Sequence, residues 1–164
     1  GWSALLTLRD RDLDLVIHAH RAGHAAFTRS PSHGINMRVI AKVARIIGVD
    51  QLHVGTAVGK MAETTADVKE NIITLTEPLH GMKDVFPVAS GGLYPGLIPA
   101  LMEIFGSNFV IQAGGGIHGH PDGSVSGARA MRQAVDAVMS GMSLEDYAGD
   151  HEELGKALET WSGS

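Results

Sequence analysis

Residues 85–92, VFPVASGG, show the pattern from which the fold can be predicted. The segment starts with apolar residues that suit a buried strand, and it ends in a serine and two glycines, where the backbone must turn tightly. Three other segments have the same form: 13–20 (LDLVIHAH), 50–55 (DQLHVG) and 108–116 (NFVIQAGGG). We therefore expect four buried strands, each ending in polar or glycine-rich residues.

The segments between these strands carry the apolar spacing of three to four residues that is typical of amphipathic helices. In residues 33–48 this spacing puts four apolar side chains on one face and Gly48 at the end of the helix. Similar patterns predict helices within 65–78, 94–106 and 126–141, two terminal helices within 143–150 and 151–161, and one early helix within 3–10. The predicted apolar faces are as follows: Ile35, Val39, Val43 and Ile46 in the helix within 33–48; Val68, Ile72 and Leu75 in the helix within 65–78; and Ala128, Met131, Val135 and Val138 in the helix within 126–141.

Strands that alternate with helices predict an α/β fold with a parallel sheet and right-handed crossovers. A closed barrel of eight strand–helix units usually needs about 250 residues. This chain has 164 residues and four such units. We therefore expect half of a (β/α)8 barrel.

The composition excludes several classes of function. With 44% hydrophobic residues the chain can build one domain with a substantial core. A net charge of −5 without a basic block speaks against a nucleic-acid partner. No cysteine is present for disulfides or thiolate metal sites, and no apolar run approaches the roughly 20 residues of a membrane span. We expect a cytoplasmic protein without a membrane partner.

Parallel α/β sheets bind ligands at the carboxyl ends of their strands. All four predicted strand ends carry residues that suit such a site. These residues are His18, His20 and Arg21 at the first end, His53 at the second, Ser90, Gly91 and Gly92 at the third, and Gln112, Gly114, Gly115 and Gly116 at the fourth.

Two of these ends resemble phosphate cradles, because backbone N–H groups without side chains attract anions. The alternative is that both glycine clusters are only tight turns. Arg21 and His53 are suited to a second anion, since a guanidinium offers paired donors to phosphate oxygens. Two anion sites on one face would fit a bisphosphate. Lys60, in the small-residue loop GTAVGK, is suited to a lid that delivers a charge, or it is a solvated loop lysine.

The His-x-His pair of His18 and His20 allows a second interpretation, because some metal-dependent hydrolases begin their metal site in this way. Such a site needs further ligands, and the other strand ends offer only His53. We expect His24 to be a structural histidine, and we do not expect His118 or His120 to be catalytic.

Five motifs together closely resemble the large subunit of ribulose-bisphosphate carboxylase (RuBisCO). In order they are HAHRAGHAAFTR, HGINMRVIAK, DQLHVGTAVGK, PVASGGLYPG and QAGGGIHGHPDG, and the resemblance covers essentially the whole chain. Details of these motifs are similar to the archaeal form III, which the family links to nucleotide salvage. The resemblance implies a carboxylase that adds CO2, or O2, to ribulose 1,5-bisphosphate.

The resemblance also implies roles for individual residues. His20 matches a proton-transfer histidine, and Arg21 and His53 match ligands of one substrate phosphate. Lys60 matches the mobile-loop lysine that meets the incoming CO2, and Ser90 matches a contact to a substrate hydroxyl. The residues that match the other phosphate site are Gly91, Gly92, Gln112, Gly114 and Gly115.

The chain departs from the family's pattern in one important respect. The family binds Mg2+ through a carbamylated lysine with a following Asp and Glu, and it uses a general-base lysine; no stretch of this sequence matches them. We therefore expect residues 1–164 to be the C-terminal half of the barrel, strands 5–8 with the terminal helices, and to be inactive alone.

The resemblance implies that large subunits assemble as a homodimer or a higher oligomer. Three alternatives stay open at this point: a RuBisCO-like enolase, a non-catalytic half-barrel that binds sugar phosphates, and a metal-dependent hydrolase built on His18 and His20.

Overall fold

The computed structural model describes residues 1–30, 32–58 and 64–162. It contains a four-stranded sheet in the order β1-β2-β3-β4, in which all three neighbouring pairs are parallel. This arrangement confirms the predicted parallel α/β fold. The strands are β1 (His18–Ala19), β2 (Gln51–His53), β3 (Phe86–Ser90) and β4 (Val110–Gln112), all within the predicted segments but shorter than them.

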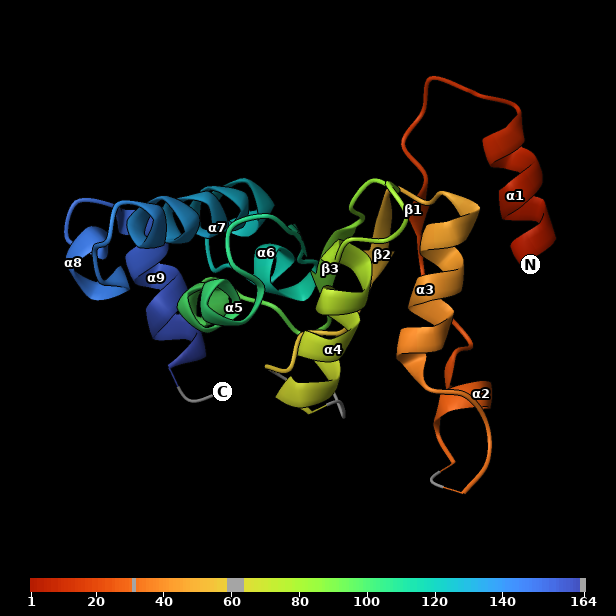
Figure 1. The fold of residues 1–164 in the computed structure, drawn as a ribbon. Helices are drawn as coiled ribbons and strands as arrows, with labels where there is room; N and C mark the ends of the chain where they lie inside the picture. Colours follow the sequence, from red (N-terminus) through yellow and green to blue (C-terminus); the bar gives the residue numbers. More distant parts are fainter. Residues whose placement is uncertain (31, 59–63, 163–164) are drawn as a thin grey trace.

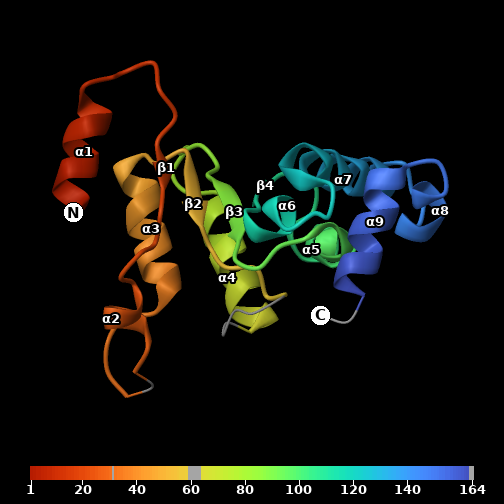
Figure 2. The same ribbon diagram turned by 180° about the vertical axis from the view of Figure 1, so that it is seen from behind.

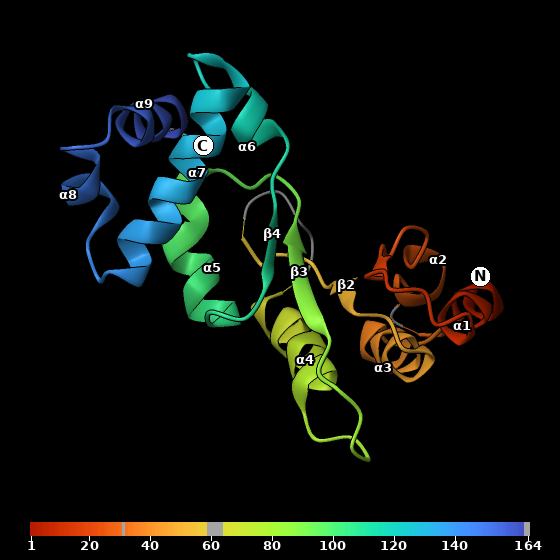
Figure 3. The same ribbon diagram turned by 90° about the horizontal axis from the view of Figure 1, so that it is seen from above.

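The helices also lie where the sequence predicts them, with two short additions, α2 and α6. Figure 1 shows their order along the chain, and Figure 3 shows α3, α4 and α5 following the sheet on the same side. In Figure 2, α6 comes directly after β4 and leads into α7. The helices are α1 (Trp2–Asp10), α2 (Ala25–Thr28), α3 (Met37–Ile47), α4 (Thr65–Thr76), the 3-10 helix η1 (Pro95–Leu97), α5 (Ile98–Phe105), α6 (Gly115–His118), α7 (Gly123–Met139), α8 (Leu144–Ala148) and α9 (Glu152–Trp161).

Local sequence explains where two of the helices begin and end. The Asn36 side chain accepts a hydrogen bond from the backbone N–H of Arg38 at the start of α3, and Gly48 ends this helix with a φ of 97°. At the start of α4, Thr64 and Asp67 form a reciprocal capping box. No helix in the described ranges is long and apolar enough to cross a membrane.

The core lies between the sheet and the helices that cover it. Val54, Val68 and Leu75 are fully buried there. Val54 follows β2 directly, and Val68 and Leu75 lie on α4, whose predicted apolar face is thereby confirmed at these two residues. Buried aliphatic side chains of this size each contribute roughly 1.5–3 kcal/mol to folding, so these contacts fix the positions of the strands that carry the site.

The predicted apolar face of α3 is wrong. Ile35, Val39 and Ile46 are largely exposed. The helix carries two apolar stripes, and it buries the one that contains alanines, since short side chains allow a close approach to the sheet. The buried residues of α3 are Met37, Ile40, Ala41, Ala44, Arg45 and Ile47.

The predicted face of α7 is shifted for a related reason. Ala128 is exposed, whereas Gly127 is buried. A Cβ atom at Gly127 would lie 2.0 Å from the carbonyl oxygen of Ile117, so α7 approaches α6 along this edge. The buried stripe consists of Gly127, Ala130, Met131, Ala134 and Ala137.

Candidate functional site

The parallel register brings the carboxyl ends of all four strands to one edge of the sheet. His53 pairs with Val88, and Ser90 pairs with Gln112. A cleft of about 630 Å³ opens at this edge, and we refer to it as the strand-end cleft. The residues that line it are His20, Arg21, Ala22, Gly23, His24, Ala25, His53, Ser90, Gly91, Gly92, Gln112, Ala113 and Gly114.

The cleft brings most of the predicted site residues together. Gly115 does not line it but follows Gly114 directly as the first residue of α6. Lys60 lies outside the described residues. The predicted site residues that do line the cleft are His20, Arg21, His53, Ser90, Gly91, Gly92, Gln112 and Gly114.

Four side chains from neighbouring strands form a continuous line of hydrogen bonds beside the cleft. Nδ1 of His18 lies 2.6 Å from Oε1 of Gln51, and its Nε2 lies 2.8 Å from Nε2 of His53. Nδ1 of His53 in turn lies 2.7 Å from Oγ of Ser90. Both ring nitrogens of His53 are therefore engaged within the chain.

Burial keeps the imidazole of His53 neutral. Only 2% of the residue is exposed. Loss of solvent, together with the neighbouring His20, His18 and Arg21, lowers the pKa of His53 from 6.5 to about 4. At neutral pH this ring carries one proton and acts as one donor and one acceptor.

His20 and Arg21 directly follow the carboxyl end of β1. Nδ1 of His20 accepts a hydrogen bond from the backbone N–H of Ala22 at 2.9 Å, so in the neutral ring the proton is on Nε2. The His20 side chain is exposed, and its ring centroid lies 4.5 Å from that of His53. Arg21 is buried and brings a permanent positive charge to the cleft. This pair can hold an anion and exchange a proton.

The glycines on the other side of the cleft keep the backbone accessible. Gly91 and Gly92 have φ values of 114° and 67°, a conformation that residues with side chains rarely adopt. Cβ atoms added at Gly114 and Gly115 would meet no atom within 4 Å, so the approach to this backbone is open. The arrangement suits an anion held by main-chain N–H groups.

The described residues of the cleft do not fit a metal ion. Among them no carboxylate lines the strand-end cleft, although carboxylate oxygens are the protein ligands that Mg2+ prefers. Within the described residues no group of three or more His, Asp or Glu side chains is arranged to hold a metal. Both ring nitrogens of His18 are hydrogen-bonded, which disfavours the hydrolase interpretation of His18 and His20.

The sequence prediction missed Gln51 and undervalued His24. Gln51 lies two residues before His53 on β2, and residues two apart in a strand point to the same face, so this spacing could have identified it. His24 lines the cleft, and its Nδ1 lies 3.0 Å from Oγ1 of Thr28.

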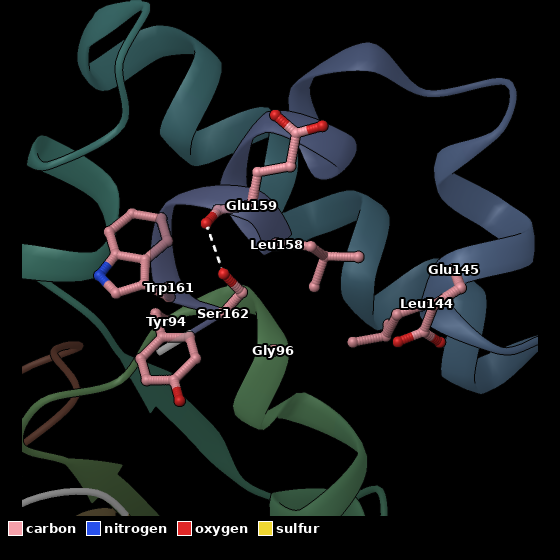
Figure 4. A pocket seen from close by; sticks show the side chains of 8 residues that line it. All are labelled: Tyr94, Gly96, Leu144, Glu145, Leu158, Glu159, Trp161 and Ser162. Atoms are coloured by element: carbon pink, nitrogen blue, oxygen red, sulfur yellow. Dashed lines mark hydrogen bonds between the residues drawn. The ribbon is translucent and has the colours of Figure 1, made fainter. Parts of the chain in front are cut away.

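A second pocket lies away from the strand ends, between η1, α8 and α9. Figure 4 shows Tyr94 facing Trp161 with nearly parallel rings; their centroids are 5.7 Å apart. Ser162 donates a hydrogen bond to the carbonyl oxygen of Glu159. None of the predicted site residues lines this pocket, and its aromatic contact joins α9 to the start of η1.

Fold and cleft together define a class: a parallel α/β half-barrel with a cleft, rich in histidine and glycine, at its strand ends. Residues 1–161 match the family model described as the catalytic domain of the ribulose bisphosphate carboxylase large chain. The chain belongs to this family, and the resemblance of its motifs is thereby confirmed.

The relatives of the chain include several archaeal carboxylases. It is 57% identical over 163 residues to the ribulose bisphosphate carboxylase of Pyrococcus furiosus, a match that covers 98% of this chain and 39% of the relative. The octameric RuBisCO of Pyrococcus horikoshii is 54% identical, with a TM-score of 0.95 over 99% of this chain and 40% of that one. The dimeric archaeal RuBisCO of Hyperthermus butylicus is 46% identical, with a TM-score of 0.88 over 98% of this chain and 41% of that one.

The chain thus spans about 40% of the length of these relatives. It corresponds to the C-terminal part of their barrel, as the resemblance of its motifs implied.

Proposed function

We propose that this chain is the substrate-binding half of the barrel of an archaeal, form III ribulose-1,5-bisphosphate carboxylase. The reaction would join CO2 to ribulose bisphosphate and give two molecules of 3-phosphoglycerate, in the service of nucleotide salvage. The observation that carries this proposal is the strand-end cleft, which combines a buried arginine, a histidine cluster and two open glycine turns in a chain 57% identical to a carboxylase.

The two sides of the cleft would hold the two phosphates. Arg21 supplies a permanent charge on one side. His53 lines the same cleft and would lie beside that phosphate, with its ring nitrogens still bonded to His18 and Ser90. On the other side the backbone at Gly91, Gly92, Gly114 and Gly115, with Gln112 beside it, would bind the second phosphate.

His20 and Lys60 would act on the reacting carbons. His20 keeps Nδ1 occupied by the N–H of Ala22, which leaves Nε2 to exchange a proton with the substrate. Lys60, on the loop that follows β2, would stabilise the negative charge that develops on the incoming CO2.

The described residues that line the cleft include no carboxylate that could hold the magnesium ion of the family. We propose that its ligands, the carbamylated lysine with the following Asp and Glu, come from a part of the barrel that this chain does not match. We also propose an assembly of large subunits in the cytoplasm, as a dimer or a higher oligomer.

The experiment that tests the function uses an assembled protein. The chain is mixed with a separately produced upstream segment of the Pyrococcus furiosus relative, and the products formed from ribulose bisphosphate, CO2 and magnesium are measured. Lys60→Ala should abolish carboxylation while some enolisation persists, and the matched control Lys69→Ala, on the exposed face of α4, should leave both unchanged. Enolisation without 3-phosphoglycerate in the parent mixture would favour a RuBisCO-like enolase, and binding without turnover would favour a sugar-phosphate-binding half-barrel.

A further inference from the structure

Three short hydrogen bonds join strands β1, β2 and β3. They run from Gln51 through His18 and His53 to Ser90. The distances are 2.6 Å from Gln51 to His18, 2.8 Å from His18 to His53 and 2.7 Å from His53 to Ser90. Of these four residues, only Ser90 and His53 line the strand-end cleft. Gln51 lies outside its lining and reaches the cleft only through the two imidazoles.

The donor and the acceptor of each of these hydrogen bonds can be assigned. The amide oxygen of Gln51 only accepts, so Nδ1 of His18 must donate. In a neutral His18 this leaves Nε2 as an acceptor, and the contact with His53 then requires the proton on Nε2 of His53. The remaining nitrogen of His53, Nδ1, accepts in turn, so the hydroxyl of Ser90 is the donor. Burial keeps His53 neutral at physiological pH.

This assignment determines whether the Ser90 hydroxyl can donate a hydrogen bond to a ligand or only accept one. A hydroxyl has one proton and two lone pairs, and here the proton is committed to His53. Toward the cleft Ser90 therefore presents only an acceptor. A ligand hydroxyl can donate to it, whereas a carbonyl or ether oxygen at the same place would face a lone pair, which costs binding energy.

We infer that Gln51 is a positioning residue: through His18 and His53 it fixes the Ser90 hydroxyl as an acceptor, so that the cleft selects a ligand that carries a hydroxyl donor at this point. The preference for a hydroxyl deepens the proposed function and rests on it. The arrangement of protons does not, because it can be observed in the absence of substrate.

The first test is NMR spectroscopy of the 15N-labelled chain at about pH 8, above the ordinary histidine pKa of about 6.5. We expect His18 to carry its proton on Nδ1 and His53 on Nε2. In Gln51→Leu these fixed proton positions should be lost. In Gln51→Glu, which keeps an acceptor at this place, they should be the same as in the parent chain. His118, whose Nδ1 lies 2.8 Å from Oγ of Ser124 outside the cleft, is the internal reference and should not change. The opposite proton positions in the parent chain, or no effect of Gln51→Leu, would overturn the inference.

The second test is a double-mutant cycle on the assembled protein, with the KM for ribulose bisphosphate as the readout. Gln51→Leu should raise KM about fivefold, the effect of one misoriented hydrogen bond, when Ser90 is present. In a Ser90→Ala background it should have no further effect, because Gln51 acts only through Ser90. An equal rise in both backgrounds would overturn the inference. If the assembled protein shows no carboxylation but the NMR pattern holds, the proposed function fails while the proton arrangement stands.

Discussion

Oγ of Ser90 lies 2.7 Å from Nδ1 of His53, and this contact joins β3 to β2 at the carboxyl edge of the sheet. It brings together two residues that are 37 positions apart in the chain. Their distance depends on the register of the two strands, so the geometry of the cleft and the stability of the fold are linked.

The first prediction concerns the pH dependence of stability. The pKa of His53 is lowered from 6.5 to about 4 in the folded chain, so between these values the unfolded state binds more protons. The free energy of unfolding should therefore decrease as the pH falls from 7 to 4.5, by about 2 kcal/mol from this group. Urea unfolding at both pH values measures the change. His53→Asn should reduce the pH dependence by this amount, whereas His33→Asn, at an exposed position, should not.

The second prediction concerns the buried arginine of α3. Only 1% of Arg45 is exposed, and its guanidinium donates to the carbonyl oxygens of Thr74 (3.0 Å), Glu77 (2.8 Å) and Lys83 (3.2 Å). Arg45→Leu leaves these buried oxygens without their donors, and we expect a loss of about 3 kcal/mol in the free energy of unfolding.

The matched control for Arg45 is Arg38→Leu on the same helix. Arg38 is largely exposed, and its ion pair with Glu70 spans 3.8 Å, so this change should cost less than about 1 kcal/mol. Equal losses in the two variants would show that Arg45 does not hold the segment between α4 and β3.

The third prediction separates two neighbouring glycines. A Cβ atom at Gly116 would lie 2.0 Å from the carbonyl oxygen of Leu93, so Gly116→Ala should destabilise the fold by about 1–3 kcal/mol. Gly115→Ala meets no atom within 4 Å and should leave stability within about 0.5 kcal/mol of the parent chain. Gly115→Ala should nevertheless weaken the binding of inorganic phosphate, measured by calorimetry. Unchanged phosphate binding would contradict the proposed cradle.

The fourth prediction concerns association of the chain by itself. β1 is an end strand of the described sheet, and the segment that leads into it exposes Leu15 (70%) and Val16 (64%). Unpaired edges with apolar flanks promote association. Light scattering should show dimers or larger species at micromolar concentration, and Leu15→Lys should reduce them. A monomer at all concentrations would contradict this prediction.

Much of the fold could be predicted from the sequence because its signals are local. The stop at Gly48 and the glycines after β3 act within a few residues of chain. Together with the alternation of strands and helices, they are sufficient to predict a parallel half-barrel whose site lies at the strand ends.

The faces of the helices could not be predicted in the same way. In α3 the side chains of Val39 and Ala41 both fit a helical period, and the fit of alanine against the sheet decides which of them is buried. The hydrogen-bonded line from Gln51 to Ser90 depends on strand register, which brings together residues from three strands. Lys60 lies outside the described residues, and its role stays a prediction.

The measurement that tests the central claim most directly is the incorporation of labelled CO2 with ribulose bisphosphate and magnesium. The chain is assayed alone and then mixed with the upstream segment of the Pyrococcus furiosus relative that carries the metal ligands. We expect acid-stable label in 3-phosphoglycerate only from the mixture. Incorporation of labelled CO2 by the chain alone would contradict the account. So would a mixture in which the two parts associate but incorporate no label.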